Sequence, residues 1–296
     1  MRFSIVIPTY DRIEMLSECL RALGEIEYPR PEFEVLVVDD AGARPAAPGA
    51  LPTPAGVTIH FLRLDENGGP AAARNLGARH AAGEYLLFMD DDCRARPDLL
   101  RQLDRVLNES PDVLVGCRVE FVPRQDLVAA ASQAIMDTSY GYFNSDPGDA
   151  RLFAGSCLAI RASRFHALGG FDPSYRTYED YDFCTRCRSA GVRLVYASEA
   201  VVLHYASPGL RRFWIRHYLY GHGAYRFHQT KAARSGTSLH LGPAGFYLRL
   251  LTSGWRRSTP LRGTVVSALV ALSQIASGAG FLSEWRSAQS SNGRSR

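Results

Sequence analysis

The sequence predicts an α/β fold with a mainly parallel sheet flanked by helices. Apolar runs of the length of a buried strand alternate with segments whose apolar residues recur at helical intervals. The strand predicted at 34–38 ends in Asp39 and Asp40, and the strand predicted at 84–89 ends in three aspartates. Because the carboxyl ends of parallel strands meet along one edge of a sheet, these acidic residues should lie at a common cleft.

The N-terminal third of the chain follows a strand–helix–strand order. Pro8 ends the first strand, and Asp11 and Glu14 have the spacing of a capping box at the start of a helix. In chain order we expect a strand at 3–8, a helix at 13–23, strands at 34–38 and 57–64 with a Pro- and Gly-rich loop at 41–56 between them, a helix at 71–82 and the strand at 84–89.

The middle of the chain continues this alternation, except for residues 123–150, which show no clear pattern. Small residues in the strand predicted at 153–161 would let a ligand approach closely. Glycines at 169–170 and 191 mark the ends of two helices. We expect a helix at 98–107, strands at 113–122 and 153–161, helices that end at 168 and 190, and short strands at 192–196 and 201–205.

Three consecutive aspartates, Asp90 to Asp92, give the strongest chemical signal. Adjacent carboxylates repel one another, and a divalent cation such as Mg²⁺ offsets that repulsion by binding carboxylate and phosphate oxygens. The alternative is a solvated turn, or a cap for the helix that follows Pro97. The position at a strand end favours the cation site.

A second acidic group, Glu179 to Asp182, opens the helix that ends at 190. Acidic residues are common at helix N-termini, and Asp182 has the spacing to pair with Arg186 one turn later. His204 lies in an apolar strand, where a histidine is more often a buried core residue than a ligand. The acidic site predicted nearby and His204 favour a functional role for the group Glu179 to Asp182.

Six scattered cysteines predict a reduced, cytosolic protein rather than a disulfide framework. Cys184 and Cys187 have the spacing of a redox or zinc pair, but no second pair supplies the other ligands, and the segment predicts a helix. The first residues enter a strand directly, so we expect no signal peptide.

Charge divides the chain near residue 206. Residues 1–206 carry 21 Lys and Arg against 29 Asp and Glu, whereas residues 207–296 carry 13 against one, Glu284. The balance of +12 in the C-terminal part suits anionic lipid, nucleic acid or an anionic substrate. We expect a domain at 1–206, a basic, aromatic and helical region at 207–286, and a disordered tail at 287–296.

The C-terminal region admits three interpretations. Residues 263–283 carry no charge and are about long enough to span a bilayer, and Arg256, Arg257 and Arg262 precede them as on a cytoplasmic side. Serines, glycines and Gln274 make this a marginal span. Interfacial or re-entrant helices, a true span and a soluble helical subdomain all stay open. No recognised nucleic-acid module accompanies the basic residues, so we expect no nucleic-acid partner.

Seven short motifs follow one another in residues 1–206: Ser4–Tyr10, Val37–Asp40, Asn67–Pro70 with Ala73–Asn75, Met89–Asp92, Gly169–Phe171, Glu179–Asp180 and His204. In this order and spacing they resemble the family 2 glycosyltransferases, whose GT-A fold is a Rossmann-like, mixed sheet with flanking helices. The resemblance implies an inverting transfer of a sugar from a nucleoside diphosphate sugar, with a UDP-sugar favoured.

The resemblance also implies a nucleotide site. The three residues Pro8, Thr9 and Tyr10 would lie along the nucleoside. Asp40 would bond the base. The other residues at the nucleotide would be Asp39, Asn67 and Gly68, with Arg74 near the base or the diphosphate.

Metal and catalytic roles follow from the same resemblance. Asp92 would bind Mg²⁺ or Mn²⁺, with Asp91 or Asp90 on the ribose and His204 as a further metal ligand or a diphosphate contact. Asp180, paired with Glu179, would be the general base. A metal would neutralise the leaving diphosphate, and a carboxylate within about 3 Å of the acceptor hydroxyl would take its proton.

The resemblance also implies an acceptor that is a glycan or a lipid-linked molecule. The implied location is the cytoplasm, at the inner face of the cell membrane, with residues 207–286 on an anionic membrane surface.

One alternative is a nucleotidyltransferase, but the Gly- and Lys-rich phosphate loop that it would need does not follow Ile7. Another is a non-catalytic subunit that binds a nucleotide sugar or a glycan, against which the two acidic motifs argue.

Overall fold

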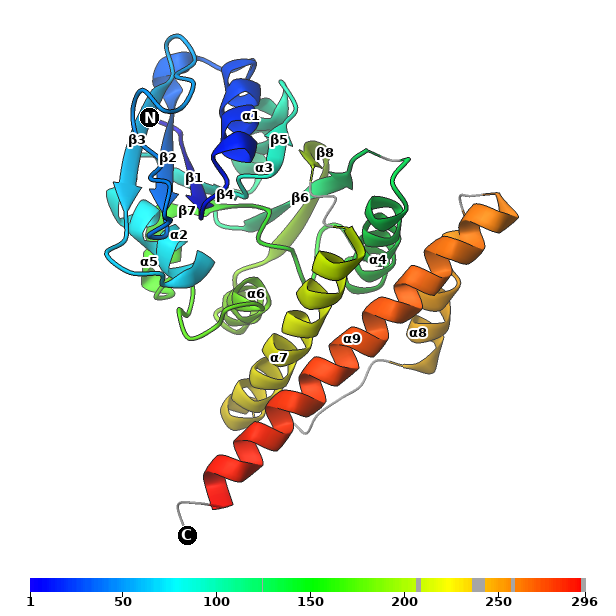
Figure 1. Cartoon of the computed structure of the whole chain (residues 1–296). Helices are drawn as coiled ribbons and strands as arrows, with labels where there is room; N and C mark the ends of the chain where they lie inside the picture. The colour runs from blue at the N-terminus through cyan, green and yellow to red at the C-terminus, as the bar shows by residue number, and fades with distance from the viewer. Residues whose placement is uncertain (124, 206–208, 236–242, 257–258, 294–296) are drawn as a thin grey trace. The chain divides into compact units, whose positions relative to one another are not determined.

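The computed structural model describes residues 1–123, 125–205, 209–235, 243–256 and 259–293 (Figure 1). The chain forms two compact units. The sheet unit comprises Met1–Glu120 and Phe143–Tyr205, and the helical unit comprises Phe121–Tyr142 and the residues from Ala206 onward. Residues 121–142 come from the stretch without a clear sequence pattern, and they belong to the helical unit.

One mixed sheet of eight strands, in the order β3-β2-β1-β4-β7-β6-β8-β5, forms the centre of the sheet unit. Its parallel part consists of β1 (Phe3–Thr9), β2 (Phe33–Asp39), β3 (Thr58–Arg63) and β4 (Tyr85–Met89). Antiparallel pairing joins β7 (Cys157–Arg161) to β4 and to β6 (Leu114–Phe121), and joins β8 (Leu194–His204) to β5 (Cys93–Ala95). The predicted α/β class is confirmed.

Helices pack on this sheet through small and aromatic residues. They are α1 (Ile13–Gly24), α2 (Gly69–His80), α3 (Leu99–Glu109), α5 (Ala162–Ala167) and α6 (Glu179–Ser189), with a short 3₁₀ turn, η1 (Arg30–Glu32). Helix α2 lies so close to β1 and β2 that a Cβ atom on Gly77 would overlap the Val6 side chain. Four packed phenylalanines join β4, α5 and α6: Phe88, Phe165, Phe171 and Phe183.

Some local expectations were wrong. Asp11 does not cap α1, because its backbone adopts φ +53° and its carboxylate accepts the Arg44 N–H at 2.8 Å. The segment 192–205 forms one strand, β8, rather than two. The three-residue strand β5 had no counterpart in the sequence analysis, and it is the partner that extends β8 to His204.

The helical unit contains α4 (Leu127–Phe143, of which Phe143 counts with the sheet unit), α7 (Gly209–Ser235), α8 (Ala244–Leu251), the 3₁₀ turn η2 (Ser253–Arg256) and α9 (Pro260–Gly293). Its core brings α4, α7, α8 and α9 together through Val128, Ala131, Phe213, Leu250, Val266 and Val270. Helices α7 and α9 cross in close backbone contact, since a Cβ atom on Gly221 or Gly280 would overlap the backbone of the other helix.

Helix α9 continues through most of the segment predicted to be a disordered tail. It extends to Gly293, and the hydroxyls of Ser287 and Ser290 bond to carbonyls one turn back in the same helix. Residues 294–296 lie outside the described residues. Within the described part of the chain, Pro260–Ser290 is the helical segment long and apolar enough to cross a membrane, with a mean hydropathy of 1.8 and 39% of the apolar window buried.

Candidate active site

The carboxyl end of β2 carries two buried aspartates with different partners. Asp39 accepts the N–H groups of Gly42 at 2.8 Å and Ala46 at 3.1 Å, and it pairs with Arg63. Asp40 accepts the N–H groups of Gly68 at 2.7 Å and Gly69 at 2.9 Å. Asp39 therefore holds the loop after β2, and Asp40 holds the start of α2 beside the same strand end.

Beside β2, the end of β1 contacts the aspartates that follow β4. The Thr9 hydroxyl donates to Asp91 Oδ2 at 2.7 Å. Arg12, just before α1, lies 3.1 Å from Asp91 Oδ1 and also pairs with Asp92. Burial, then repulsion from Asp92 and Asp90, raises the pKa of Asp91 to about 7, although Arg12 and Thr9 oppose that shift. Arg12 is thus the counter-ion of this acidic group.

Arg74 connects the two acidic motifs of the sequence. This buried side chain from α2 donates to Glu179 Oε1 at 2.7 Å and to Asp90 Oδ1 at 2.6 Å. Glu179 begins α6 and Asp90 follows β4, so one guanidinium fixes the separation of two segments that are far apart in the chain. Arg74, which the resemblance put near the base or the diphosphate, therefore lies between the two acidic motifs.

Replacing Arg74 with methionine should lower the free energy of unfolding by about 3 kcal/mol, because it leaves the carboxylate of Glu179 buried without its cation. Urea denaturation followed by circular dichroism measures the change. Arg79→Met, at an exposed position on the same helix, is the control and should change stability by less than about 0.5 kcal/mol. Equal free energies of unfolding for the two variants would show that the ion pairs of Arg74 contribute as little to stability as exposed surface ion pairs.

Asp180, next to Glu179, has a carboxylate fixed by backbone donors. Oδ2 accepts the Gly155 N–H at 2.7 Å, and Oδ1 accepts the Tyr181 N–H at 2.8 Å. Burial and the neighbouring Glu179 raise the pKa of Asp180 to about 7, against the opposing effects of Gly155 and Arg74. A carboxyl group with such a pKa exists in both protonation states near neutral pH, which suits proton transfer.

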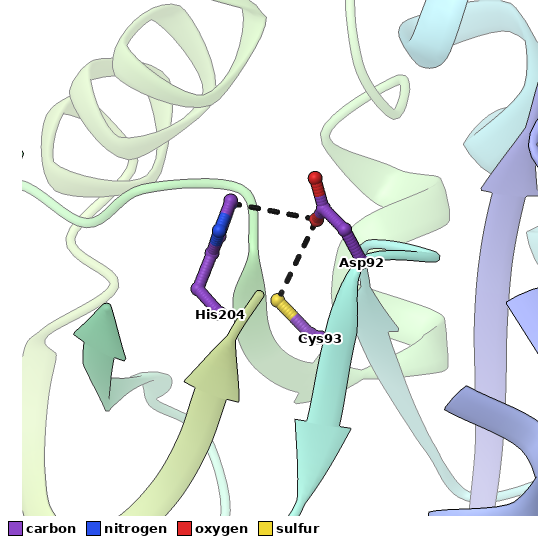
Figure 2. A group of neighbouring side chains, drawn as sticks. All are labelled: Asp92, Cys93 and His204. Carbon is purple, nitrogen blue, oxygen red and sulfur yellow. Dashed lines mark hydrogen bonds and ion pairs between the residues drawn. The ribbon is translucent and has the colours of Figure 1, made fainter. Parts of the chain in front are cut away.

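Three buried side chains converge where β5 pairs with β8. Figure 2 shows Asp92, Cys93 and His204, whose ligand atoms all lie within 4.8 Å of one another. His204 Nε2 is 3.4 Å from Asp92 Oδ1, and Cys93 Sγ is 4.0 Å from the same oxygen. Cys93 and His204 are register partners, and the Tyr205 N–H bonds the Asp92 carbonyl at 2.8 Å. Strand pairing therefore fixes the backbone of all three residues.

This donor set fits a divalent cation. Ligand atoms that lie about 2.0–2.3 Å from a shared ion are roughly 3–4 Å apart, which matches the separations around Asp92 Oδ1. A carboxylate oxygen with an imidazole nitrogen suits Mn²⁺ and related transition ions, and carboxylate with phosphate suits Mg²⁺. Cys93 adds a sulfur atom to the group, although burial raises the pKa of this thiol well above its usual range.

All of the expected site residues belong to the sheet unit. Tyr10 is 48% exposed, and Asn67 is exposed with its side-chain carbonyl accepting from Arg176 at 2.9 Å. The sequence analysis missed Arg12 and Cys93. Cys93 could have been found from its position directly after the aspartates. Arg12 gives no such signal, because nothing in a loop sequence shows which carboxylate an arginine contacts.

Comparison with known proteins identifies related sequences. The family model described as "Glycosyl transferase family 2" matches residues 4–169. Glycosyltransferase AglE of Haloferax volcanii is 28% identical over 207 residues, which cover 69% of this chain and 67% of AglE. The poly(ribitol-phosphate) beta-N-acetylglucosaminyltransferase TarS of Staphylococcus aureus is 32% identical over 117 residues, covering 39% of this chain and 20% of TarS. The chain therefore matches only part of each relative.

Solved structures share the fold. The mannosyltransferase PcManGT from Pyrobaculum calidifontis, in complex with GDP-Man and Mn²⁺, has a TM-score of 0.59 at 21% identity, covering 97% of this chain and 80% of PcManGT. S. aureus TarS 1–349 in complex with UDP has a TM-score of 0.57 at 16% identity, covering 98% of this chain and 92% of that one. At these identities the likeness concerns the fold alone.

Proposed function

Because this chain belongs to glycosyl transferase family 2 and is a glycosyltransferase of the GT-A fold, we propose that it transfers a sugar from a nucleoside diphosphate sugar to an acceptor hydroxyl with inversion, assisted by Mn²⁺ or Mg²⁺. The observation that carries the proposal is the linked acidic cluster. Asp92 and His204 offer a cation site, and Asp90, Arg74 and Glu179 connect the aspartate run to Asp180. A cation site near a carboxyl group poised for proton transfer is the pairing that this reaction needs.

The proposed donor site follows the carboxyl ends of β1 and β2. Pro8, Thr9 and Tyr10 form its β1 side, with the exposed Tyr10 ring available to a nucleoside. Asp40 with Asn67 and Gly68 forms the β2 side, and Asp39 supports it by holding the loop at 41–56. Asp91, whose Oδ2 accepts the Thr9 hydroxyl, would contact the ribose. TarS in complex with UDP supports uracil as the favoured base, and PcManGT in complex with GDP-Man supports guanine as the alternative base.

In the proposed mechanism Asp92 and His204 would hold the cation. When bound, the cation supplies the positive charge that neutralises the leaving diphosphate. Arg12 pairs with the carboxylates of Asp91 and Asp92, so it would supply positive charge beside the same site. Asp180 accepts the proton of the acceptor hydroxyl while that oxygen attacks the anomeric carbon from the face opposite the diphosphate. Gly155 and Tyr181 orient its carboxylate through their N–H groups.

Transfer should accelerate as pH rises on the acid side of neutrality. Burial and Glu179 raise the pKa of Asp180 to about 7, and only the ionised carboxylate accepts a proton, so kcat/KM should fall below that pH. A bound dication lowers the pKa of a nearby carboxyl, so the midpoint in the metal-loaded enzyme lies at or below about 7. Initial rates across a pH series measure the profile. A flat acid limb would remove Asp180 from the role of base.

Donor binding can be tested without transfer. Purified full-length protein is screened by thermal denaturation against UDP, GDP and their sugars, with and without Mn²⁺ or Mg²⁺. At a hundredfold excess over the dissociation constant, a ligand of the native state stabilises by about 2.7 kcal/mol, which corresponds to a rise of about 5 °C or more in Tm. We expect the rise with one nucleoside diphosphate and only with metal. No rise with any nucleotide and either metal would overturn the proposed donor site.

We also propose a glycan or lipid-linked acceptor and a cytoplasmic location. The polymer acceptor in the name of TarS supports the first. All six cysteines are free and buried, which is consistent with a reducing compartment. Isolated membrane and soluble fractions, assayed with the donor identified by the thermal screen, would show which fraction carries an acceptor.

A further inference from the structure

The exposed large apolar side chains of this protein concentrate in the helical unit. In the described part of the chain, three such residues belong to the sheet unit, Met1, Tyr10 and Met15, and fifteen belong to the helical unit. Soluble surfaces tolerate single exposed apolar residues, but a concentration of them marks a surface that contacts something apolar.

The densest group lies where α8, η2 and the first turns of α9 meet. We call it the apolar corner, and it consists of Tyr247, Leu248, Leu251, Trp255, Leu261 and Val265. Leu261 is 79% exposed, Leu248 64% and Trp255 49%. Behind them, Leu250 and Val266 share one buried core, and the Trp255 indole N–H donates to the Thr264 hydroxyl at 3.1 Å. The corner is therefore a supported structure that presents apolar side chains to solvent.

Two exposed arginines lie in the segments of the apolar corner, and the helical unit also carries Asp126 and Asp137 in residues 121–142. The arginines are Arg249 and Arg256, and the one acidic residue after position 206 is Glu284, which already pairs with His222 and Arg226. Surfaces that combine leucine, tryptophan and arginine bind the headgroup region of anionic membranes. A second copy of this chain is a poorer occupant, because it would bring the same arginines face to face.

The contacts of α9 favour lying on a membrane over crossing it. Along its length α9 packs against α7, which carries Arg211, Arg212, Arg216, Arg226, Lys231 and Arg234. Ser277 donates to the His217 carbonyl at 3.0 Å, and Glu284 pairs with His222 and Arg226 at the same interface. A helix with that many charges is costly in hydrocarbon, so an α9 that stays paired with α7 remains outside it.

We propose that the apolar corner inserts into the headgroup region of an anionic membrane, with Arg249 and Arg256 on lipid phosphates and α9 outside the hydrocarbon. The chain is then a surface-bound protein whose helical unit is its anchor. This inference rests on the helical unit alone and does not require the proposed sugar transfer.

Co-sedimentation of the full-length protein with vesicles tests the proposal. We expect binding to phosphatidylcholine vesicles that contain phosphatidylglycerol, weaker binding without it, and release by high salt. The double variant Leu248→Ser with Trp255→Ser should bind about tenfold more weakly. Ile275→Ser is the matched control, because Ile275 is 62% exposed on α9 outside the corner, and it should bind like the wild type.

Several outcomes would overturn the proposal. Equal losses in Ile275→Ser and in the double variant would show that α9 inserts along its length, as would resistance of the wild type to alkaline extraction from vesicles. No binding to anionic vesicles would exclude a membrane anchor. A dimer in sedimentation equilibrium that the double variant abolishes would assign the corner to a second copy. Circular dichroism spectra and thermal unfolding, measured on the same samples, show whether the variants are folded.

Discussion

Replacing Asp180 with asparagine should lower kcat for sugar transfer by about a thousandfold and leave the dissociation constant of the donor within about twofold of the wild-type value. Asparagine keeps one oxygen that can accept the Gly155 N–H, although its amide NH₂ cannot accept the Tyr181 N–H that Asp180 Oδ1 accepts in the wild type. It has no site that accepts the proton of an acceptor hydroxyl, so the chemical step fails. Rates with saturating donor and calorimetric titration with the nucleoside diphosphate measure the two quantities separately.

Asp182→Asn is the matched control for Asp180→Asn. It removes the same charge from the first turn of α6, where Asp182 pairs with Arg186 at 2.7 Å. Arg186 keeps its bonds to the carbonyls of Leu168 and Gly170, so the helix stays in place. We expect kcat within about threefold of wild type. Near-normal turnover in Asp180→Asn would assign the base elsewhere. A wild-type protein that binds a nucleotide sugar and never turns it over would instead be a binding subunit.

Replacing Asp92 with alanine should abolish the metal-dependent part of donor binding. With Mn²⁺ present, the dissociation constant of the nucleoside diphosphate should rise at least about a hundredfold, because His204 and Cys93 alone cannot hold the ion against two phosphate groups. Isothermal titration with and without EDTA measures the change. In EDTA the wild type and the variant should bind the nucleotide equally weakly, which shows that the variant still folds. Unchanged Mn²⁺-dependent binding in Asp92→Ala would move the ion to another carboxylate.

The fold and the acidic strand ends were predictable because they depend on local patterns. A run such as Tyr85–Met89 is fully buried, and its apolar composition already identifies a strand. The order of strands and helices then fixes which ends share an edge. Asp182 and Arg186 pair as their spacing predicts, since both lie on one helix. The GT-A fold followed from short motifs, most of which lie at the end of a single strand or the start of a single helix.

Contacts between distant segments were not predictable. The pairing of Cys93 with His204 depends on β5, and three residues are too few to show the alternation of a strand. Arg12 could have paired with any of several carboxylates, and the conformation of its loop brings it to Asp91 and Asp92. Asp11 is an example of a local motif that failed. Its spacing to Glu14 predicts a helix cap, but its carboxylate instead accepts the backbone N–H of Arg44, more than thirty residues away.

The helix α4 was missed for a different reason. Its buried residues are mainly small, and its apolar positions do not gather on one face, so the usual signal of a surface helix is weak. It packs with α7, α8 and α9 in the helical unit, and that core exists only when all of these helices are present.

The order of the proposed cation ligands along the chain has a consequence for biosynthesis. Asp92 and Cys93 leave the ribosome long before His204, which is the last residue of β8. Until β8 pairs with β5, the growing chain holds the carboxylate and the thiol without the imidazole. If Asp92, Cys93 and His204 hold an ion as proposed, the site is complete only after residue 204 has left the ribosome and β8 has paired with β5. Truncation by a premature stop codon ahead of His204 would yield a chain with the aspartates of the donor cleft and an incomplete ion site.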